Sequence, residues 1–222
     1  MAYTFSRSGI RYLRTTAPVT ATPLTISAWS YPTGVPAWPS PVCFLVSLGD
    51  TSANEYRFSL GWSGYAASPA RALINVSGPI PGGGSTSGTS VSGAVTLNTW
   101  QHLAGVFVGQ YERYAYWNGI VSPINTTGLV PTGIDSLLIG TARTTVNETQ
   151  QVGRIAEVGV WNAALSAAEI NSLAAGMSPE LIRPQSLVFY APLIRDLTDK
   201  VGGRILTNVN NNTISDHTRI FI

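Results

Sequence analysis

The feature that most constrains the fold of this chain is its series of short apolar or alternating segments separated by turn residues. Such segments predict β-strands, and the glycine, proline and Asn-Gly pairs between them predict turns. Only one segment has a helical pattern, in which Ser166 and Glu169 form an S-x-x-E capping box ahead of apolar residues at helical spacing. The sequence therefore predicts an all-β protein, an antiparallel two-sheet jelly-roll sandwich with one short helix near residues 165–175. The segments expected as strands are 23–31, 41–49, 56–62, 71–78, 99–109, 112–121, 136–141, 153–161, 187–193, 204–209 and 217–222.

The connections between these segments carry two further expectations. Asn118-Gly119 predicts a two-residue type I′ turn, because both positions of such a turn need a positive φ. The Gly/Ser-rich stretch 78–93 predicts a flexible loop. No change of composition marks a boundary, so we expect a single domain over residues 1–222.

Charge is sparse in this sequence. Only 24 of the 222 residues are Asp, Glu, Lys or Arg, whereas 45 are serine or threonine. The net charge of +2 argues against nucleic-acid binding, and the 44% hydrophobic content argues against disorder. The longest apolar stretch, 41–48, is too short to cross a membrane, so no membrane insertion is expected. A surface of neutral hydroxyl groups suits packing against other subunits, where a buried charge would cost desolvation.

The cysteine content and the first residues indicate the compartment. Cys43 is the only cysteine and lies in an apolar run, so no intramolecular disulfide forms and the thiol is expected in the core. The first fifteen residues contain arginines but no continuous apolar segment, so we expect no signal peptide and synthesis in a cytoplasm.

The order of motifs resembles the concanavalin A-like superfamily, in its laminin-G/pentraxin-type jelly-roll branch. The matching pieces are TISAWSYPTG, LNTWQHLAGVF, RYAYWNGIV, LLIGT and GRIAEVGVWNAALSAAEINSLA, which span roughly residues 20–176. The resemblance implies that segment 177–222 adds a closing strand at 187–193, lying beside the N-terminal strand, and a short tail. It also implies that the helix closes one end of the sandwich and that His102 and Glu157 have structural roles.

Candidate ligand-binding residues are few. Trp38 and Trp62 lie at expected loops, where an exposed indole offers a stacking surface for a sugar ring or a partner; the alternative is that both cover the ends of the core. Trp29, Trp100, Trp117 and Trp161 fall in expected strands and are predicted to be core residues.

The resemblance implies a calcium site in the loop 142–152, where Glu148 and Asn147 are the candidate ligands. One carboxylate with amides supplies few oxygen ligands and little negative charge for calcium, so we expect no bound cofactor.

No catalytic residues are predicted. The E-x-D-x-x-E strand of the glucanase branch is missing, and the neighbouring acids Asp196 and Asp199 are expected in a solvated turn. A Ser-His-Asp arrangement around His102 or His217 has no G-x-S-x-G turn to support it.

Three functions remain open on the sequence. The first is a non-catalytic structural or adhesive protein of a virion surface, because the resemblance extends to capsid decoration and fibre-associated proteins of tailed bacteriophages. It would form a homo-oligomer such as a trimer, pack on the major capsid protein or other virion proteins, and contact cell-surface glycans. The second is a soluble carbohydrate-binding lectin, and the third is a glycoside hydrolase.

Overall fold

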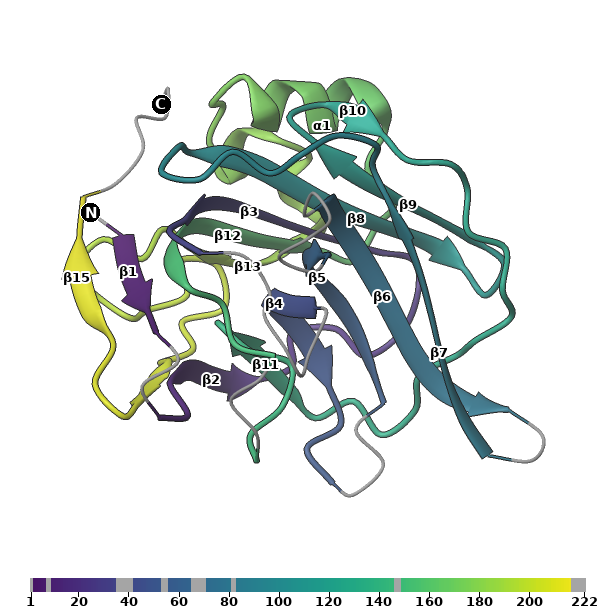
Figure 1. Cartoon of the computed structure of the whole chain (residues 1–222), viewed down its shortest axis with the longest axis horizontal. Helices are drawn as coiled ribbons and strands as arrows, with labels where there is room; N and C mark the ends of the chain where they lie inside the picture. Colours follow the sequence, from purple (N-terminus) through teal and green to yellow (C-terminus); the bar gives the residue numbers. More distant parts are fainter. Residues whose placement is uncertain are drawn as a thin grey trace.

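The computed structural model describes residues 2–6, 9–34, 42–52, 56–64, 71–80, 83–145 and 149–216. These residues form two antiparallel β-sheets that pack face to face, so the predicted all-β sandwich is confirmed (Figure 1). The described part also contains one α-helix, α1 (Ala167–Ala174), and two 3-10 helices, η1 (Pro179–Leu181) and η2 (Pro184–Ser186). Among the described residues, no helix has the length and apolar character that a membrane span needs.

The first sheet, sheet A, has the strand order β10-β9-β8-β3-β12-β1-β15, and β13 also pairs with β12. β1 and β13 pair with the same edge of β12, β1 with its first half and β13 with its second half. The closing strand β13 therefore lies beside β12 and not, as was expected, beside the N-terminal strand. The strands of this sheet are β1 (Ala2–Phe5), β3 (Leu24–Pro32), β8 (Gln101–Gly109), β9 (Glu112–Trp117), β10 (Ile120–Val121), β12 (Gly153–Trp161), β13 (Leu187–Ala191) and β15 (Thr213–Ser215).

The second sheet, sheet B, has the order β14-β2-β11-β4-β5-β6-β7. Within the stretch 78–93 predicted as a loop, residues 78–80 end β6 and residues 83–90 form β7, so the prediction is wrong for these residues, whereas 81–82 lie outside the described residues. The strands of this sheet are β2 (Tyr12–Thr16), β4 (Val42–Gly49), β5 (Arg57–Ser63), β6 (Arg71–Ile80), β7 (Gly83–Ser90), β11 (Ser136–Ile139) and β14 (Thr207–Val209).

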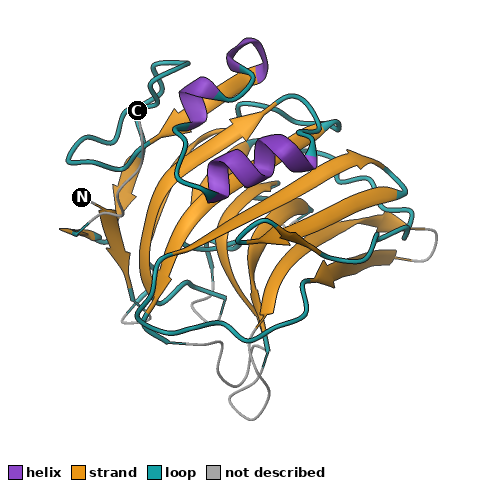
Figure 2. Cartoon of the chain, turned by 90° about the horizontal axis from the view of Figure 1, so that it is seen from above, coloured by secondary structure: helices purple, strands orange, loops and turns teal. Residues whose placement is uncertain are grey.

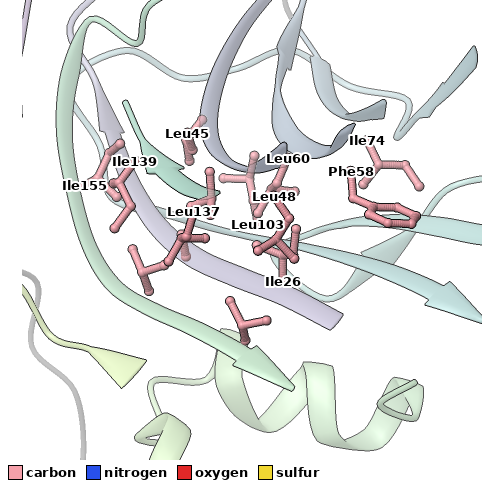
Figure 3. Close-up of a cluster of buried hydrophobic side chains, with 14 of the residues drawn as sticks. Ile26, Leu45, Leu48, Phe58, Leu60, Ile74, Leu103, Leu137, Ile139 and Ile155 are labelled. Atoms are coloured by element: carbon pink, nitrogen blue, oxygen red, sulfur yellow. The ribbon is translucent and has the colours of Figure 1, made fainter. Parts of the chain in front are cut away.

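The core lies between the two sheets. Side chains alternate between the faces of a strand, so β3 and β5 each send every second residue inward. Ile26, Leu60 and Leu103 meet there among buried aliphatic residues from both sheets (Figure 3). Phe58 and Phe107 add an edge-to-face ring pair with centroids 5.2 Å apart. This continuous apolar layer holds the two sheets together, which leaves their outer faces for other roles.

Helix α1 lies on the outer face of sheet A (Figure 2). Its capping box is formed as predicted, because Ser166 Oγ accepts from the Glu169 backbone N–H and the Glu169 carboxylate accepts from the Ser166 backbone N–H. The buried residues Ile170 and Leu173 pack on Ala104 and Val106 of β8 in a second apolar cluster. The helix thus covers part of the face of sheet A and does not close an end of the sandwich as expected, because its apolar residues pack on outward-facing side chains of β8. Sheet B carries no described helix.

The predicted Asn118-Gly119 turn is also confirmed. Both residues have positive φ, +47° and +83°, as a type I′ turn requires. Asn118 Oδ1 accepts a hydrogen bond from the His102 backbone N–H at 2.8 Å, which ties the turn to β8.

Candidate functional site

The outer face of sheet B has a neutral polar floor. In the strand register, Ser47 of β4 lies opposite Ser59 of β5, and Ser59 lies opposite Asn75 of β6. Ser47 Oγ donates to Ser59 Oγ at 2.9 Å. All three side chains are buried, and Asn75 Oδ1 has no hydrogen-bond partner within the described part of the chain. Such a buried amide oxygen is costly to leave without a partner, so this floor is a buried polar layer beneath the surface.

A first cavity of about 240 Å³ opens on this face. Leu138 of β11 is part of its lining, with residues 50–52 and 142–145. Asp50 Oδ1 and Oδ2 accept from the Ser52 backbone N–H and hydroxyl, both at 2.7 Å. Asp50 is therefore held by its neighbours at the rim, among three threonines and a serine.

A second cavity, of about 510 Å³, lies over β2, β14 and the start of β11. Threonines, a serine and the apolar side chains of Ile205 and Val209 line it, together with Tyr12 and the charged pair Arg14 and Asp135. Ile205 is 77% exposed, so the cavity has an open apolar wall beside its polar groups.

A small hydrogen-bond cluster lies where the two cavities meet. Arg14 donates to Ser136 Oγ from Nε at 3.2 Å and from Nη2 at 3.1 Å, and Nη2 also donates to Thr51 Oγ1 at 3.4 Å. Thr51 donates to the Asp135 carboxylate from its hydroxyl at 2.8 Å and from its backbone N–H at 3.3 Å.

The same cluster sets the charge of Asp135. Partial burial acts to raise the pKa of the carboxyl, but hydrogen bonds from Thr51 and Ser136 and the charge of Arg14 outweigh it and hold the pKa below the ordinary value. Asp135 is therefore an ionised acceptor at neutral pH.

The structure corrects the prediction for Trp62. The side chain is 1% exposed and belongs to the core, because β5 extends to Ser63 and its alternation places Trp62 on the same inward face as Phe58 and Leu60. A ring with no exposed face offers no stacking surface to a sugar. The alternation of apolar residues in 56–62 is the sequence signal that indicates the burial of Trp62.

The other predicted site residues, Trp38, Asn147 and Glu148, lie outside the described residues. Residues 142–145 of the predicted calcium loop are described and line the first cavity. Within the described ranges, no three His, Cys, Asp or Glu side chains gather as metal ligands would. The calcium site and the Trp38 contact therefore stay predictions.

Half-buried aromatic residues lie on the outer face of sheet A. Trp100 packs edge-to-face on Tyr31 with centroids 5.6 Å apart, and the Arg154 guanidinium lies 4.8 Å over the Tyr31 ring. Trp29 makes a similar edge contact with His102 at 5.5 Å. Of the four tryptophans expected in the core, Trp161 is fully buried and Trp117 is partly buried against the core between the sheets, whereas Trp29 and Trp100 are partly exposed.

His102 and Ser27 form a buried pair without the features of a catalytic one. His102 Nε2 and Ser27 Oγ are 2.8 Å apart, and both residues are about 1% exposed. His102 Nδ1 has no described partner, so no carboxylate orients the ring as a triad needs. Burial lowers the pKa of His102 to about 3, so the imidazole is neutral. This agrees with the expected structural role; His217 lies outside the described residues.

Two buried carboxylates support the segment after α1. Glu157, at 1% exposure, accepts from the Tyr190 hydroxyl at 2.5 Å. Asp199 was expected in a solvated turn, but it is buried and accepts from Arg204 at 2.8 Å and from the Tyr190 backbone N–H at 3.0 Å. Only Asp196 matches that expectation, in an exposed ion pair with Lys200. None of these acids faces either cavity.

Comparison with known proteins identifies the family to which the sequence is similar. The model of a family described as the concanavalin A-like lectin/glucanases superfamily matches residues 8–171. No curated protein matches the chain in sequence.

Solved structures share the fold at low identity. A candidate carbohydrate-binding protein from Bacteroides ovatus superposes with a TM-score of 0.64 at 19% identity, over 96% of this chain and 58% of that one. A heptameric SAP-like pentraxin from Limulus polyphemus gives 0.61 at 17% identity, over 94% and 95% of the two chains. A tailspike protein of an Escherichia coli O157:H7 bacteriophage gives 0.52 at 18% identity, over 81% of this chain and 25% of the tailspike. This chain thus spans little more than half of the Bacteroides protein, and the likenesses establish the fold.

Proposed function

The chain belongs to the concanavalin A-like lectin/glucanase superfamily, and from that premise we propose that it is a non-catalytic carbohydrate-binding protein whose site is the outer face of sheet B. The observation that carries the proposal is the pair of hydroxyl-lined cavities on this face. Sugars present hydroxyl groups that both donate and accept, and threonine and serine side chains match them without the desolvation cost of a charge.

The acids that line the cavities among the described residues lack the features of a hydrolytic pair. Glycoside hydrolysis needs one carboxyl group with a raised pKa to protonate the leaving oxygen. The pKa of Asp135 is shifted in the opposite direction, and both oxygens of Asp50 already accept hydrogen bonds from Ser52. This arrangement favours binding over cleavage.

A glycan array tests the proposal, with a matched pair of variants. Thr51→Val keeps the side-chain shape but removes the hydroxyl between Arg14 and Asp135, and we expect it to weaken glycan binding about ten-fold. Thr213→Val changes an exposed threonine on β15 of sheet A and should leave binding unchanged. An array without bound glycans, or equal losses in the two variants, would contradict the proposal.

The same samples test the absence of catalysis. Incubation with each bound oligosaccharide should release no new reducing ends. Cleavage that disappears in Asp135→Asn would show that the protein is a hydrolase.

For the biological setting, we propose a virion surface, where the protein would act as an adhesive or decoration protein. Two observations support this: the sparse charge of the sequence, which suits packing in an assembly, and the shared fold with a domain-sized part of a bacteriophage tailspike. The partners would be copies of this chain and other virion proteins, and Trp38 is a candidate contact. Imaging of native particles and the mass of the purified protein test this setting, and a monomer that no particle contains would contradict it.

A further inference from the structure

The two cavities on the outer face of sheet B lie on neighbouring strands. β14, β2, β11 and β4 pair in that order, and Leu138 in the first cavity lies directly opposite Arg14 in the second. Residues that are directly opposite in adjacent strands point to the same face. The two cavities therefore open side by side on one surface.

Hydrogen-bonded residues of the two linings lie between them. Thr51 lines the first cavity, whereas Arg14 and Asp135 line the second, and the hydrogen bonds among these three residues form the boundary. Arg14 and Asp135 are both exposed to solvent. A ligand that crosses the boundary would thus meet a donor, a hydroxyl and an acceptor.

Together the two cavities extend along the surface. The first cavity, about 240 Å³, is below the roughly 300–1,000 Å³ of ordinary ligand sites, and the second, about 510 Å³, lies within that range. The lining strands β14, β2 and β11 span about 10 Å at a spacing of about 4.8 Å, and the loops 50–52 and 142–145 extend the surface beyond β11. A chain of several sugars would use this length, whereas one sugar would leave most of it empty.

The charges indicate an uncharged ligand. Among the described lining residues, each cavity has one carboxylate and one guanidinium: Asp50 with Arg143, and Asp135 with Arg14. Balanced charges give no net attraction for an acidic or a basic chain. The exposed Ile205 and the buried Tyr12 add apolar surface, which suits the C–H face of a sugar ring.

From these observations we infer that the two cavities form one groove, which binds a linear, uncharged oligosaccharide across β14, β2 and β11 as far as the loops 50–52 and 142–145, with Thr51 and Asp135 at its middle. This inference rests on the proposed carbohydrate binding and adds the length and charge of the ligand.

Calorimetric titration with neutral oligosaccharides of glucose, galactose, xylose and arabinose, from monosaccharides to pentasaccharides, tests the inference. Within the series that binds, affinity should rise at least about ten-fold from one sugar to three or four and then level off. Thr207→Tyr on β14 and Thr145→Tyr at the first cavity each place a bulky ring in one half of the groove. Each should abolish the gain in affinity with length.

The control variant is Thr213→Tyr, which places the same ring at an exposed threonine of a three-residue edge strand in sheet A. It should bind every oligosaccharide like the unmodified protein. Affinity that does not depend on length, or equal behaviour of Thr207→Tyr and Thr213→Tyr, would overturn the groove and leave carbohydrate binding intact. If no sugar binds in the calorimetric titration or on the glycan array, both the groove and the proposed carbohydrate binding are overturned. Stronger binding of acidic oligosaccharides of equal length would overturn the uncharged ligand.

Discussion

The buried His102 predicts a specific loss of stability in mild acid. Burial lowers its pKa from 6.5 to about 3 in the folded protein, whereas the unfolded chain keeps the ordinary value. Between these two values only the unfolded state takes up the proton, so the free energy of unfolding decreases as the pH falls below 6.5. The contribution of His102 to stability is therefore complete above pH 6.5 and is lost progressively toward pH 3.

The magnitude follows from the shift. At about 1.36 kcal/mol per pH unit, lowering the pH from 7 to 5 should remove about 2 kcal/mol through this one residue. The carboxylates whose pKa values are lowered, such as Asp135 and Glu169, lose their contribution only below about pH 4.5, so they act outside this window.

Urea unfolding followed by tryptophan fluorescence at pH 7, 6 and 5 measures the effect. His102→Gln cannot titrate and retains a polar group near Ser27. The change in unfolding free energy between pH 7 and 5 should be about 2 kcal/mol smaller in the variant than in the unmodified protein. Equal pH dependence in the two proteins would refute the account of His102 as a neutral, buried residue.

Two further predictions concern the segment around α1. Ser166→Ala removes the N-cap hydroxyl that accepts from the Glu169 backbone N–H, and thermal unfolding should show a loss of about 1 kcal/mol, whereas Ser172→Ala, at a half-buried serine within the helix, should cost far less. Tyr190→Phe removes the hydroxyl that donates to the buried Glu157 carboxyl, and urea unfolding should show a loss of about 1–3 kcal/mol in the free energy of unfolding. An unchanged free energy of unfolding would show that this hydrogen bond does not stabilise the fold.

The sequence predicts correctly those elements that depend on interactions between residues close together in the chain. The α1 capping box and the Asn118-Gly119 turn depend on residues within a few positions of each other, and the structure has both. The alternation of apolar residues in β5 likewise indicates that Trp62 is buried. This signal was missed because the strand was expected to end at Trp62, which placed the residue at a loop.

Stretch 78–93 shows where local composition misleads. Its glycines indicate a loop, but a Cβ at Gly88 would lie 2.6 Å from the Ile74 carbonyl oxygen of the paired strand, and one at Gly78 would lie 2.9 Å from that of Val130. Glycine is needed here for close approach of backbones, to the paired strand at Gly88 and to the segment around Val130 at Gly78, and not for flexibility. Only the tertiary pairing distinguishes the two uses.

The groove could not be predicted from the sequence, because distant residues form it. Thr51 and Asp135 are 84 positions apart, and Arg14 and Ser136 are 122 positions apart. They meet because β2 and β4 both pair with β11. Their serine and threonine neighbours appear in the sequence only as an excess of hydroxyl residues.

The most direct test of the central claim is the location of a bound sugar by NMR. On titration with the tightest-binding neutral oligosaccharide, the account predicts shifts of the backbone amide signals of Thr51, Ser136 and Thr207 in the groove. The indole N–H signals of Trp29 and Trp100, on the outer face of sheet A, should stay unchanged. Shifts confined to those indoles, with the groove amides unchanged, would contradict the assignment of the binding site to sheet B.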